Sequence, residues 1–536
     1  MDHKGDFSWW KHGVVYQIYP RSFYDSNGDG IGDIPGVIAK LDYLSRLGVD
    51  AIWLSPINTS PMFDFGYDIS DYRGIDPDFG TDEDFARLIV ESHRRNIRII
   101  MDLVINHTSH LHPWFIKSRS SRNNPKRNWY IWHDGRKGGP PNNWRAVFGG
   151  RSWEWDSATG QYYHHSFLPE QPDLNWRDPG LREAVGGEIR YWLDRGVDGF
   201  RLDAVTWFVK DELFRDNPLG WGPNAPRPYD LQRHVYDQNR PETHDVLKGL
   251  RVLVDDYDGR MMVGETYAAA PGDPRMAAAH MGNGADQLHL AFDFSLLFSR
   301  YGAAHFRRCL DEWYAALPPD GWPCLVLNNH DQPRSIARWC RGREGMKKAR
   351  LLAALLLAAW GTPFLYYGEE LGMDNGTVKR REIQDPLGKR YWPLMKGRDP
   401  ERTPMLWSPE PHAGFTSGEP WLPVNTGDSA CNVAAQMDDP DSLLNFHRAL
   451  IALRKKREAL HRGSIRMAGN DPRVLAFFRE KGGERLFVAL NFSGRRVSIP
   501  LDGTTPRVLF GTDRKGGAAA SGSKLEMAPF EALILE

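Results

Sequence analysis

Cysteine is scarce in this chain of 536 residues, which contains only Cys309, Cys324, Cys340 and Cys431. No two of them form a CxxC pair, and their density is far below that of a small domain held together by disulfides. The pattern therefore predicts buried thiols in a reducing compartment, and we expect a cytoplasmic location.

Long apolar runs are also missing. The longest covers residues 351–360, whereas a membrane-spanning helix needs about 20 apolar residues. The first ten residues include several charged side chains and do not read as a signal peptide. We therefore expect no membrane partner.

No excess of one charge sign is present, because 68 Lys and Arg residues face 69 Asp and Glu residues. A balanced chain has no general attraction to nucleic acid or to anionic membranes. Its 41% hydrophobic and 26% charged residues are typical of a folded protein, and its length predicts two or three domains. We expect small-molecule substrates, no nucleic-acid partner, and a monomer or dimer.

What the chain does contain is a repeated alternation of short apolar segments with amphipathic helices. Helix starts are marked by Thr81 with Asp84, a capping box, and by Asp178 before Pro179. Eight strands alternating with helices favour an α/β fold, a (β/α)8 TIM barrel, over a doubly wound sheet. The predicted strands cover residues 14–19, 51–54, 97–105, 197–204, 261–265, 288–294, 324–329 and 364–367.

Three regions break the alternation. Residues 108–177, rich in Trp, Arg, Asn and Gly, predict a subdomain inserted after strand 3, and residues 371–426 predict an irregular subdomain or loop after strand 8. Short strands beyond residue 463 predict a C-terminal all-β domain, residues 463–536. The catalytic barrel would then comprise residues 1–107 and 178–462.

Polar residues gather at the carboxyl ends of the predicted strands, where barrel enzymes carry their chemistry. Asp203 and Glu265 follow neighbouring strands, and two carboxyls about 5–5.5 Å apart suit glycoside cleavage with retained configuration. Arg201 lies two residues before Asp203, so both side chains can point to one side and the cation can keep Asp203 ionised. A single Asp at a strand end is more often a helix cap or one half of an ion pair. That explanation does not suit a set of polar residues at the ends of four strands.

Five segments carry a resemblance to a known family: DLVINH at 102–107, QPDLN at 171–175, GFRLD at 199–203, VGE at 263–265 and NHD at 329–331. In order and spacing they resemble the α-amylase superfamily, specifically its oligo-1,6-glucosidase and α-glucosidase branch. The resemblance implies that Asp203 is the nucleophile, Glu265 the general acid/base, and Asp331 the third carboxylate, which grips the sugar during cleavage.

The same resemblance implies further contacts with the sugar. Asp64 and Tyr67 would close the non-reducing end of the site, with Arg402 pairing with Asp64. The remaining residues expected to bind substrate are His107, Gln171, Arg201 and His330.

One metal signal lies near the N-terminus, where Asp25, Asn27, Asp29, Ile31 and Asp33 place oxygen atoms at every second position. This spacing is EF-hand-like, although Gly36 stands where the usual glutamate would be. Resemblance to the family implies a structural Ca²⁺, with Mg²⁺ possible; an Asx-turn loop without an ion is the alternative. No organic cofactor is expected.

The implied function is release of glucose from the non-reducing end of short α-1,4-linked glucosides such as maltose, through a covalent glucosyl-Asp intermediate. A transglucosylase or a sucrose isomerase would use the same intermediate, and the sequence does not decide between them. A non-catalytic relative is disfavoured because all three carboxylates are present. Ala204, after the nucleophile, resembles a linkage switch in which Ala accompanies α-1,4 and Val α-1,6 cleavage.

Overall fold

The computed structural model describes residues 7–220, 227–267, 272–425, 427, 429–501, 506–512, 517–518 and 524–536. The first six residues and Thr426, which entered the predictions above, lie outside the described residues. Within the described ranges no helix is long and apolar enough to cross a bilayer. Among the described cysteines, Cys309, Cys324 and Cys340 are buried and form no disulfide.

A parallel eight-stranded sheet forms the centre of the molecule, and neighbouring strands follow the order of the chain. Seven hydrogen-bonded ladders join the strands, and β11 contacts β12 to close the ring. This arrangement confirms the (β/α)8 prediction. The strands are β1 (Val15–Ile18), β2 (Ala51–Leu54), β5 (Arg98–Leu103), β9 (Gly199–Leu202), β10 (Met261–Glu265), β11 (Leu290–Phe292), β12 (Cys324–Val326) and β13 (Thr362–Tyr366).

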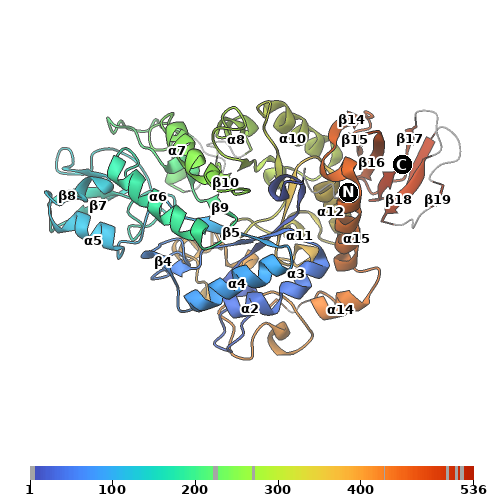
Figure 1. Ribbon diagram of the computed structural model, residues 1–536, viewed down its shortest axis with the longest axis horizontal. Coiled ribbons are helices and arrows are strands. Elements are labelled where there is room, and N and C mark those ends of the chain that lie inside the picture. Colours follow the sequence, from blue (N-terminus) through green and yellow to red (C-terminus); the bar gives the residue numbers. More distant parts are fainter. Residues whose placement is uncertain are drawn as a thin grey trace.

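Helices surround this sheet (Figure 1). The longer ones are α4 (Asp82–Arg94), α6 (Pro179–Asp194), α7 (Thr243–Asp255), α10 (Ala303–Ala316), α12 (Gly345–Ala358) and α15 (Leu443–Lys456). Shorter helices are α1 (Trp9–His12), α2 (Ile34–Ala39), α3 (Leu41–Leu47), α5 (Pro113–Ser120), α8 (Pro274–Ala279), α9 (Ser295–Phe298), α11 (Ser335–Trp339), α13 (Pro386–Tyr391), α14 (Val433–Asp438) and α16 (Glu458–His461).

Local signals set several helix ends as the sequence predicted. Thr81 and Asp84 form the full capping box of α4, and the side chain of Asp178 accepts a hydrogen bond from the N–H of Leu181 at the start of α6. Gly48 ends α3 with φ 94°, a left-handed conformation that glycine adopts without steric cost.

Five strands, β1, β5, β9, β11 and β12, are shorter than predicted, and the differences at β5 and β9 shape the site. The apolar run 97–105 forms a strand only over Arg98–Leu103, and the predicted strand 197–204 only over Gly199–Leu202. Beyond these points the chain leaves the ladder and turns across the mouth of the barrel, so Asn106, His107 and Asp203 project there instead of continuing the sheet.

Apolar side chains form two main layers. One cluster fills the barrel interior and includes Val15, Ile100, Val263 and Phe364. A larger cluster lies between the strands and the surrounding helices. Because strands buried on both faces need apolar residues at every position, this packing explains their unbroken apolar runs.

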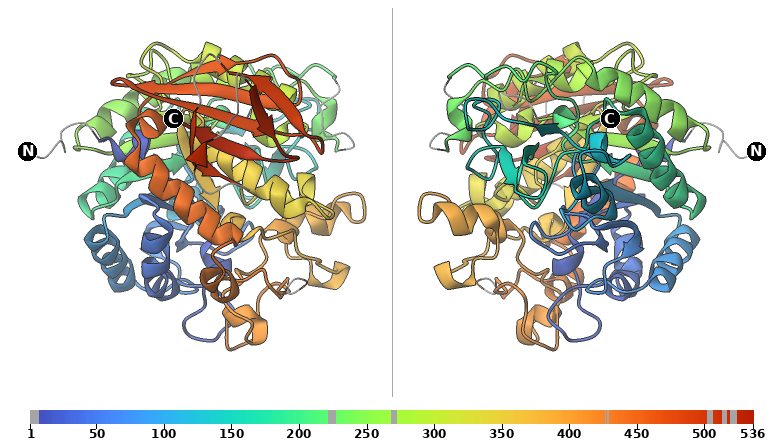
Figure 2. Two further views of the ribbon diagram at one scale, coloured as in Figure 1. Left: turned by 90° about the vertical axis from the view of Figure 1, so that its right-hand side faces the viewer. Right: turned by 90° about the vertical axis from the view of Figure 1, so that its left-hand side faces the viewer.

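The insertion after β5 and the C-terminal domain lie at opposite ends of the long axis (Figure 1). The insertion contains an antiparallel sheet of β6 (Trp132–His133), β8 (Gln161–His164) and β7 (Trp153–Asp156). The C-terminal strands form a six-stranded sheet, β14-β15-β16-β21-β18-β19, and the pair β17 with β20, seen face-on in the left view of Figure 2. Their bounds are β14 (Ser464–Ala468), β15 (Val474–Lys481), β16 (Glu484–Asn491), β17 (Val497–Pro500), β18 (Arg507–Gly511), β19 (Gly517–Ala518), β20 (Lys524–Met527) and β21 (Ala532–Leu535).

Candidate active site

Arg201 is the centre of the site. It lies on β9 in register with Asp102 of β5, and its Nη1 donates to Asp102 Oδ1 at 2.8 Å and to Asp203 Oδ1 at 2.7 Å. Its Nη2 lies 2.9 Å from Glu265 Oε2. Asp203 and Glu265 therefore bind the two terminal nitrogens of one guanidinium, which holds the two carboxyls close together.

The three carboxyls share one cation, so they cannot all ionise easily. Burial raises the pKa of Asp203 to about 7, opposed by Arg201 and reinforced by Asp102. Burial raises the pKa of Glu265 further, to about 8, and Asp203 and Asp331 add to the effect of burial. The proton of the pair therefore favours Glu265, which leaves Asp203 as the carboxylate.

Asp331 has two arginine partners. Arg402 Nη2 lies 2.7 Å from Asp331 Oδ1, and Arg398 Nη1 lies 3.3 Å from the same oxygen. Burial opposes ionisation, but His330, Arg398, Arg402 and Arg201 together outweigh it and hold the pKa of Asp331 below its usual range. Asp331 is therefore a fixed negative charge at the mouth of the barrel.

The predicted partner of Asp64 was wrong. Arg398, not Arg402, pairs with Asp64, with Nη2 at 2.7 Å from Oδ1, and the same nitrogen lies 2.6 Å from Asp385 Oδ1. Arg402 instead reaches Asp331 and donates to the His330 carbonyl at 2.8 Å. The two arginines stand four residues apart in an irregular segment, where sequence alone could not tell which one faces Asp64.

Tyr67 lies against His330, with stacked rings 5.6 Å apart and its hydroxyl 2.5 Å from His330 Nε2. Behind it, Gln171 Nε2 lies 3.1 Å from His107 Nε2 and donates to Asp64 Oδ2 at 3.3 Å. The inserted subdomain thus reaches the barrel mouth through Gln171, which joins the side chains of Asp64 and His107.

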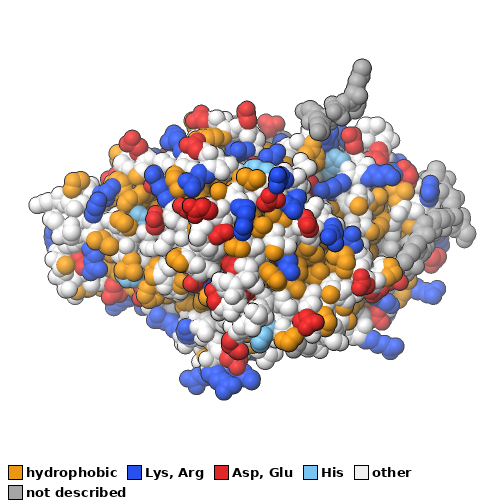
Figure 3. All heavy atoms as spheres, turned by 60° about the horizontal axis from the view of Figure 1, so that its bottom comes forward, with side chains coloured by type: hydrophobic (Ala, Val, Ile, Leu, Met, Phe, Trp, Pro, Cys, Tyr) orange, Lys and Arg blue, Asp and Glu red, His pale blue; other side chains and the backbone are white. Residues whose placement is uncertain are grey.

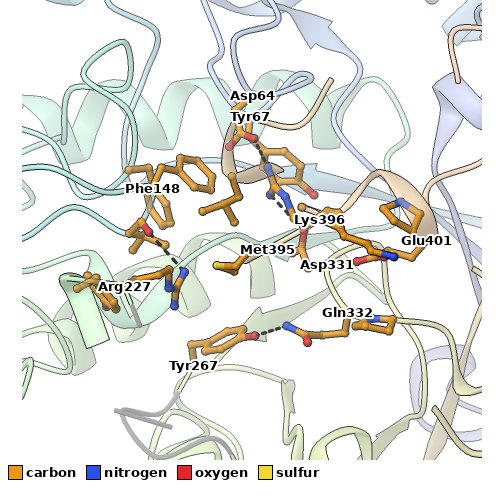
Figure 4. A pocket seen from close by; sticks show the side chains of 18 of the residues that line it. Asp64, Tyr67, Phe148, Arg227, Tyr267, Asp331, Gln332, Met395, Lys396 and Glu401 are labelled. Atoms are coloured by element: carbon orange, nitrogen blue, oxygen red, sulfur yellow. Dashed lines mark hydrogen bonds and ion pairs between the residues drawn. The ribbon is translucent and has the colours of Figure 1, made fainter. Parts of the chain in front are cut away.

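These side chains surround a cavity of about 1050 Å³ (Figure 4). Six of the ten residues expected in catalysis or substrate binding line it: Asp64, Tyr67, His107, Asp203, Glu265 and Asp331. The other four are buried behind this lining and position it: Gln171, Arg201, His330 and Arg402.

Sequence reasoning missed several functional positions. Asp102 belongs to a quoted motif but received no role, although it binds Arg201 and accepts a hydrogen bond from Tyr67 at 3.2 Å. Arg398 lies in a segment without periodicity, so no pattern pointed to it. Further lining residues are Phe148, Phe167, Trp207, Arg227, Tyr267, Gln332 and Glu401.

Ala204, the residue that resembles a linkage switch, does not border the cavity. It has left-handed backbone angles, φ 47° and ψ 41°, its side chain is buried, and it is absent from the cavity lining. Its N–H donates to Glu265 Oε2 at 3.1 Å. Any influence of residue 204 on linkage must therefore pass through the position of Glu265 or its neighbours.

The loop predicted to bind a metal consists of tight turns. Asp25 accepts hydrogen bonds from the N–H groups of Gly28 and Gly30, each at 2.8 Å, and Asp33 caps α2 through Gly36 N–H at 2.6 Å. Oxygen donors of this kind fit a hard cation, which would replace some of these N–H contacts. Among the described residues no three His, Cys, Asp or Glu side chains could hold a metal by themselves, so an ion here would also need Asn27 and a backbone carbonyl.

Comparisons with known proteins agree with this geometry. The protein-family model described as "Alpha amylase, catalytic domain" matches residues 17–463, and the family model described as "Alpha-amylase SusG C-terminal domain" matches residues 474–534. A probable alpha-glucosidase of Rhizobium meliloti is 44% identical over 507 residues, 92% of this chain and 91% of the relative. An oligo-1,6-glucosidase of Parageobacillus thermoglucosidasius is 42% identical over 520 residues, 90% of each chain.

Solved structures also match this chain over nearly its whole length. An alpha-glucosyl transfer enzyme, XgtA, superposes with a TM-score of 0.93 at 43% identity over 99% of both chains. The trehalulose synthase MutB from Pseudomonas mesoacidophila MX-45 superposes with a TM-score of 0.89 at 37% identity, also over 99% of both. The barrel, the cluster around Arg201 and these matches lead to one conclusion: this chain is an enzyme of the alpha-amylase family.

Proposed function

We propose that this enzyme is a retaining, exo-acting α-glucosidase that releases glucose from the non-reducing end of short α-1,4-linked glucosides such as maltose. The observation that carries the proposal is the placement of Asp203 and Glu265 on the two terminal nitrogens of Arg201. Two close carboxyls with different pKa values are the apparatus of a double-displacement glycosidase.

In the first step, the Asp203 carboxylate attacks the anomeric carbon while the Glu265 carboxyl gives its proton to the departing glycosidic oxygen. The C–O bond to the leaving sugar breaks, and a glucosyl ester of Asp203 forms. In the second step, Glu265, now ionised, takes a proton from water as that water attacks the same carbon. Glucose leaves with its configuration retained, and Glu265 is protonated again.

Positive charge develops on the ring during both steps. Asp331 is a held anion beside the nucleophile, and its arginine partners prevent it from taking up a proton. A charge fixed in place before the reaction stabilises the transition state without reorganisation. Contacts that strengthen only in the transition state raise kcat rather than tighten ground-state binding.

The closed end of the cavity supports cleavage of terminal glucose units. Asp64, Arg398 and Asp385 form a buried chain of ion pairs, and the guanidinium of Arg398 also lies 5.1 Å from the ring centre of Phe148. A sugar chain could not extend through such a wall. One glucose unit would fill the space in front of it, with the scissile bond at Asp203.

Transfer to another sugar is the second candidate function. The likeness to an alpha-glucosyl transfer enzyme and to a trehalulose synthase favours it, and both reactions pass through a glucosyl-Asp ester. The choice depends on whether water or an acceptor hydroxyl reaches the ester. Three buried thiols, Cys309, Cys324 and Cys340, support a cytoplasmic location. Charges of both signs are interspersed on the face in Figure 3, which suits small uncharged glucosides better than a polyanionic partner, and we expect a monomer or dimer.

A substrate panel tests the proposed function. We expect maltose to be cleaved at least about tenfold better, in kcat/KM, than isomaltose, because a small difference in how the second sugar fits beside the scissile bond is worth about 1–3 kcal/mol. Glucose and transfer products from maltose, isomaltose, sucrose, trehalose and starch should be measured separately. Preference for isomaltose would refute the linkage assignment, and transfer exceeding hydrolysis at low substrate concentration would favour the second candidate.

The linkage assignment has its own variant. We expect Ala204→Val to lower the ratio of maltose to isomaltose cleavage. Because a β-branched residue is strained in the left-handed conformation of residue 204, the melting temperature must be measured too. Ala204→Ser, which is not β-branched, is the matched control. An unchanged ratio in a folded Ala204→Val enzyme would remove residue 204 from the determinants of linkage.

Calcium binding by the loop 25–33 is the proposal for the metal, with Asp25, Asn27, Asp29, Asp33 and the Ile31 carbonyl as ligands. Bound calcium would join the ends of the turn and stabilise the fold. At a Ca²⁺ concentration about 100 times Kd we expect a stabilisation of about 2.7 kcal/mol, read as a rise in melting temperature. Chelator should reverse the rise, and Asp29→Ala, at an exposed loop position, should abolish it. A melting temperature insensitive to Ca²⁺ and Mg²⁺ would favour the Asx-turn alternative.

A further inference from the structure

Glu401 is a buried carboxyl that lines the cavity, yet the proposed mechanism gives it no task. It ends the 3₁₀ turn η8 (Asp399–Glu401), directly before Arg402. Its residue is 3% exposed, and Figure 4 shows it beyond Asp331, on the side away from Phe148.

The carboxyl of Glu401 has little compensation for its burial. Asn375 Nδ2 donates to Oε2 at 3.2 Å, and within the described part of the chain no cation lies within ion-pair distance of Glu401. The neighbouring Arg398 and Arg402 use their guanidinium groups on Asp64, Asp331, Asp385 and the His330 carbonyl. A buried acceptor with too few hydrogen-bond donors lowers the stability of the folded state unless a ligand supplies a donor.

The donor that pairs with Glu401 is fixed in position. Asn375 Oδ1 accepts a hydrogen bond from Arg334 N–H at 2.7 Å, and the adjacent Gly376 N–H donates to the Pro400 carbonyl at 2.6 Å. The segments that contain Gly376 and Pro400 are thus joined next to the Glu401 carboxyl. A polar group held in place before the ligand arrives binds it with less loss of entropy.

Glu401 cannot share the task of Arg402. In a 3₁₀ turn consecutive side chains point about 120° apart, and Arg402 reaches back to Asp331 behind the first sugar. Asp64 and Tyr67 lie at the proposed position of the first glucose, and Figure 4 shows Glu401 to one side of both, in the irregular segment 371–426. The hydroxyl that reaches Glu401 must therefore belong to a different sugar unit.

We propose that Glu401 is a specificity-determining residue that accepts a hydrogen bond from a hydroxyl of the second sugar unit, the leaving group in cleavage and the acceptor in transfer. The inference rests on the proposed function and deepens it, because it names a polyhydroxylated second unit as the preferred partner of the glucosyl ester. A substrate without that unit gains nothing from Glu401.

Two variants of similar volume separate polarity from packing. Glu401→Met removes the acceptor, and Glu401→Gln keeps one. For Glu401→Met we expect the ratio of kcat/KM for maltose to kcat/KM for α-glucosyl fluoride, which has no second sugar, to fall roughly tenfold, as expected for one lost hydrogen bond to a buried group. Glu401→Gln should keep the ratio within about threefold, and transfer to maltose should fall with the ratio in Glu401→Met.

Glu410→Met, at an exposed glutamate of the same segment, is the control and should leave the ratio unchanged. If Glu401→Met does not fold, Glu401→Ala gives the same comparison without added bulk. Parallel losses on both substrates, or an unchanged ratio in the folded variant, would overturn the inference. Wild-type turnover of α-glucosyl fluoride tests the proposed function separately, since without such turnover there is no glucosyl ester for a second sugar to meet.

Discussion

Asp203→Asn is expected to lower kcat by about 10⁴-fold or more on every substrate, since removal of a nucleophile usually abolishes covalent catalysis. The amide cannot form the glucosyl ester, so a good leaving group does not restore the rate. The readouts are kcat on maltose and on α-glucosyl fluoride, with mass spectrometry of wild-type enzyme quenched during turnover to detect an adduct on the peptide containing Asp203.

The same substitution should not harm the fold. Asp102, Asp203 and Glu265 share Arg201, and burial holds the pKa of Asp203 at about 7. When the pKa of a carboxyl is raised in the folded state, the protein loses stability as the pH rises from the ordinary pKa of that carboxyl through the raised one. At pH 8 the neutral amide should therefore raise the melting temperature. Asp320→Asn, at an exposed position, is the control for a change of charge alone. Residual turnover within about a hundredfold of wild type would contradict the nucleophile assignment.

Glu265→Gln is expected to lower kcat/KM for maltose by about 10²- to 10⁴-fold, the usual contribution of general acid/base catalysis. α-Glucosyl fluoride should lose far less in the first step, because fluoride departs without a proton. Hydrolysis of the glucosyl ester would then limit turnover, so a burst of fluoride followed by a slow steady rate is the expected signature. Equal losses on maltose and on the fluoride burst would contradict the role of Glu265 as the acid.

The pH profile provides a second test of this pair. Activity needs Asp203 ionised and Glu265 protonated, so kcat/KM should rise as pH passes about 7 and fall above about 8. The two values belong to the pair, since each carboxyl feels the other. In Glu265→Gln the fall above pH 8 should disappear, because no proton remains to be lost there.

The sequence was sufficient for much of the fold because its signals are local. Apolar runs at 51–54 and 261–265 became β2 and β10 with the predicted bounds, and Thr81 with Asp84 began α4. The runs at 97–105 and 197–204 overran their strands, because apolar residues that face the barrel mouth resemble apolar residues within the sheet. Where a strand ends depends on where its neighbours end, and a single segment does not contain that information.

The three carboxylates of the candidate site could also be predicted from the sequence. A carboxylate or a base directly after each buried strand must reach one mouth, since the carboxyl ends of parallel strands meet there. Asp203, Glu265 and Asp331 followed from that rule and from their motifs, and the structure brings them to one cavity.

Only the tertiary structure decided which partner each of these groups meets. Arg398 and Arg402 stand in an irregular segment, so sequence spacing could not say that Arg398 reaches Asp64 while Arg402 reaches Asp331. Ala204 itself has left-handed backbone angles, which no propensity predicts for alanine. This conformation turns its side chain away from the cavity. Strand ends and motifs depend on neighbours in the chain, whereas ion pairs, burial and the resulting pKa values depend on groups hundreds of residues apart that meet only after folding.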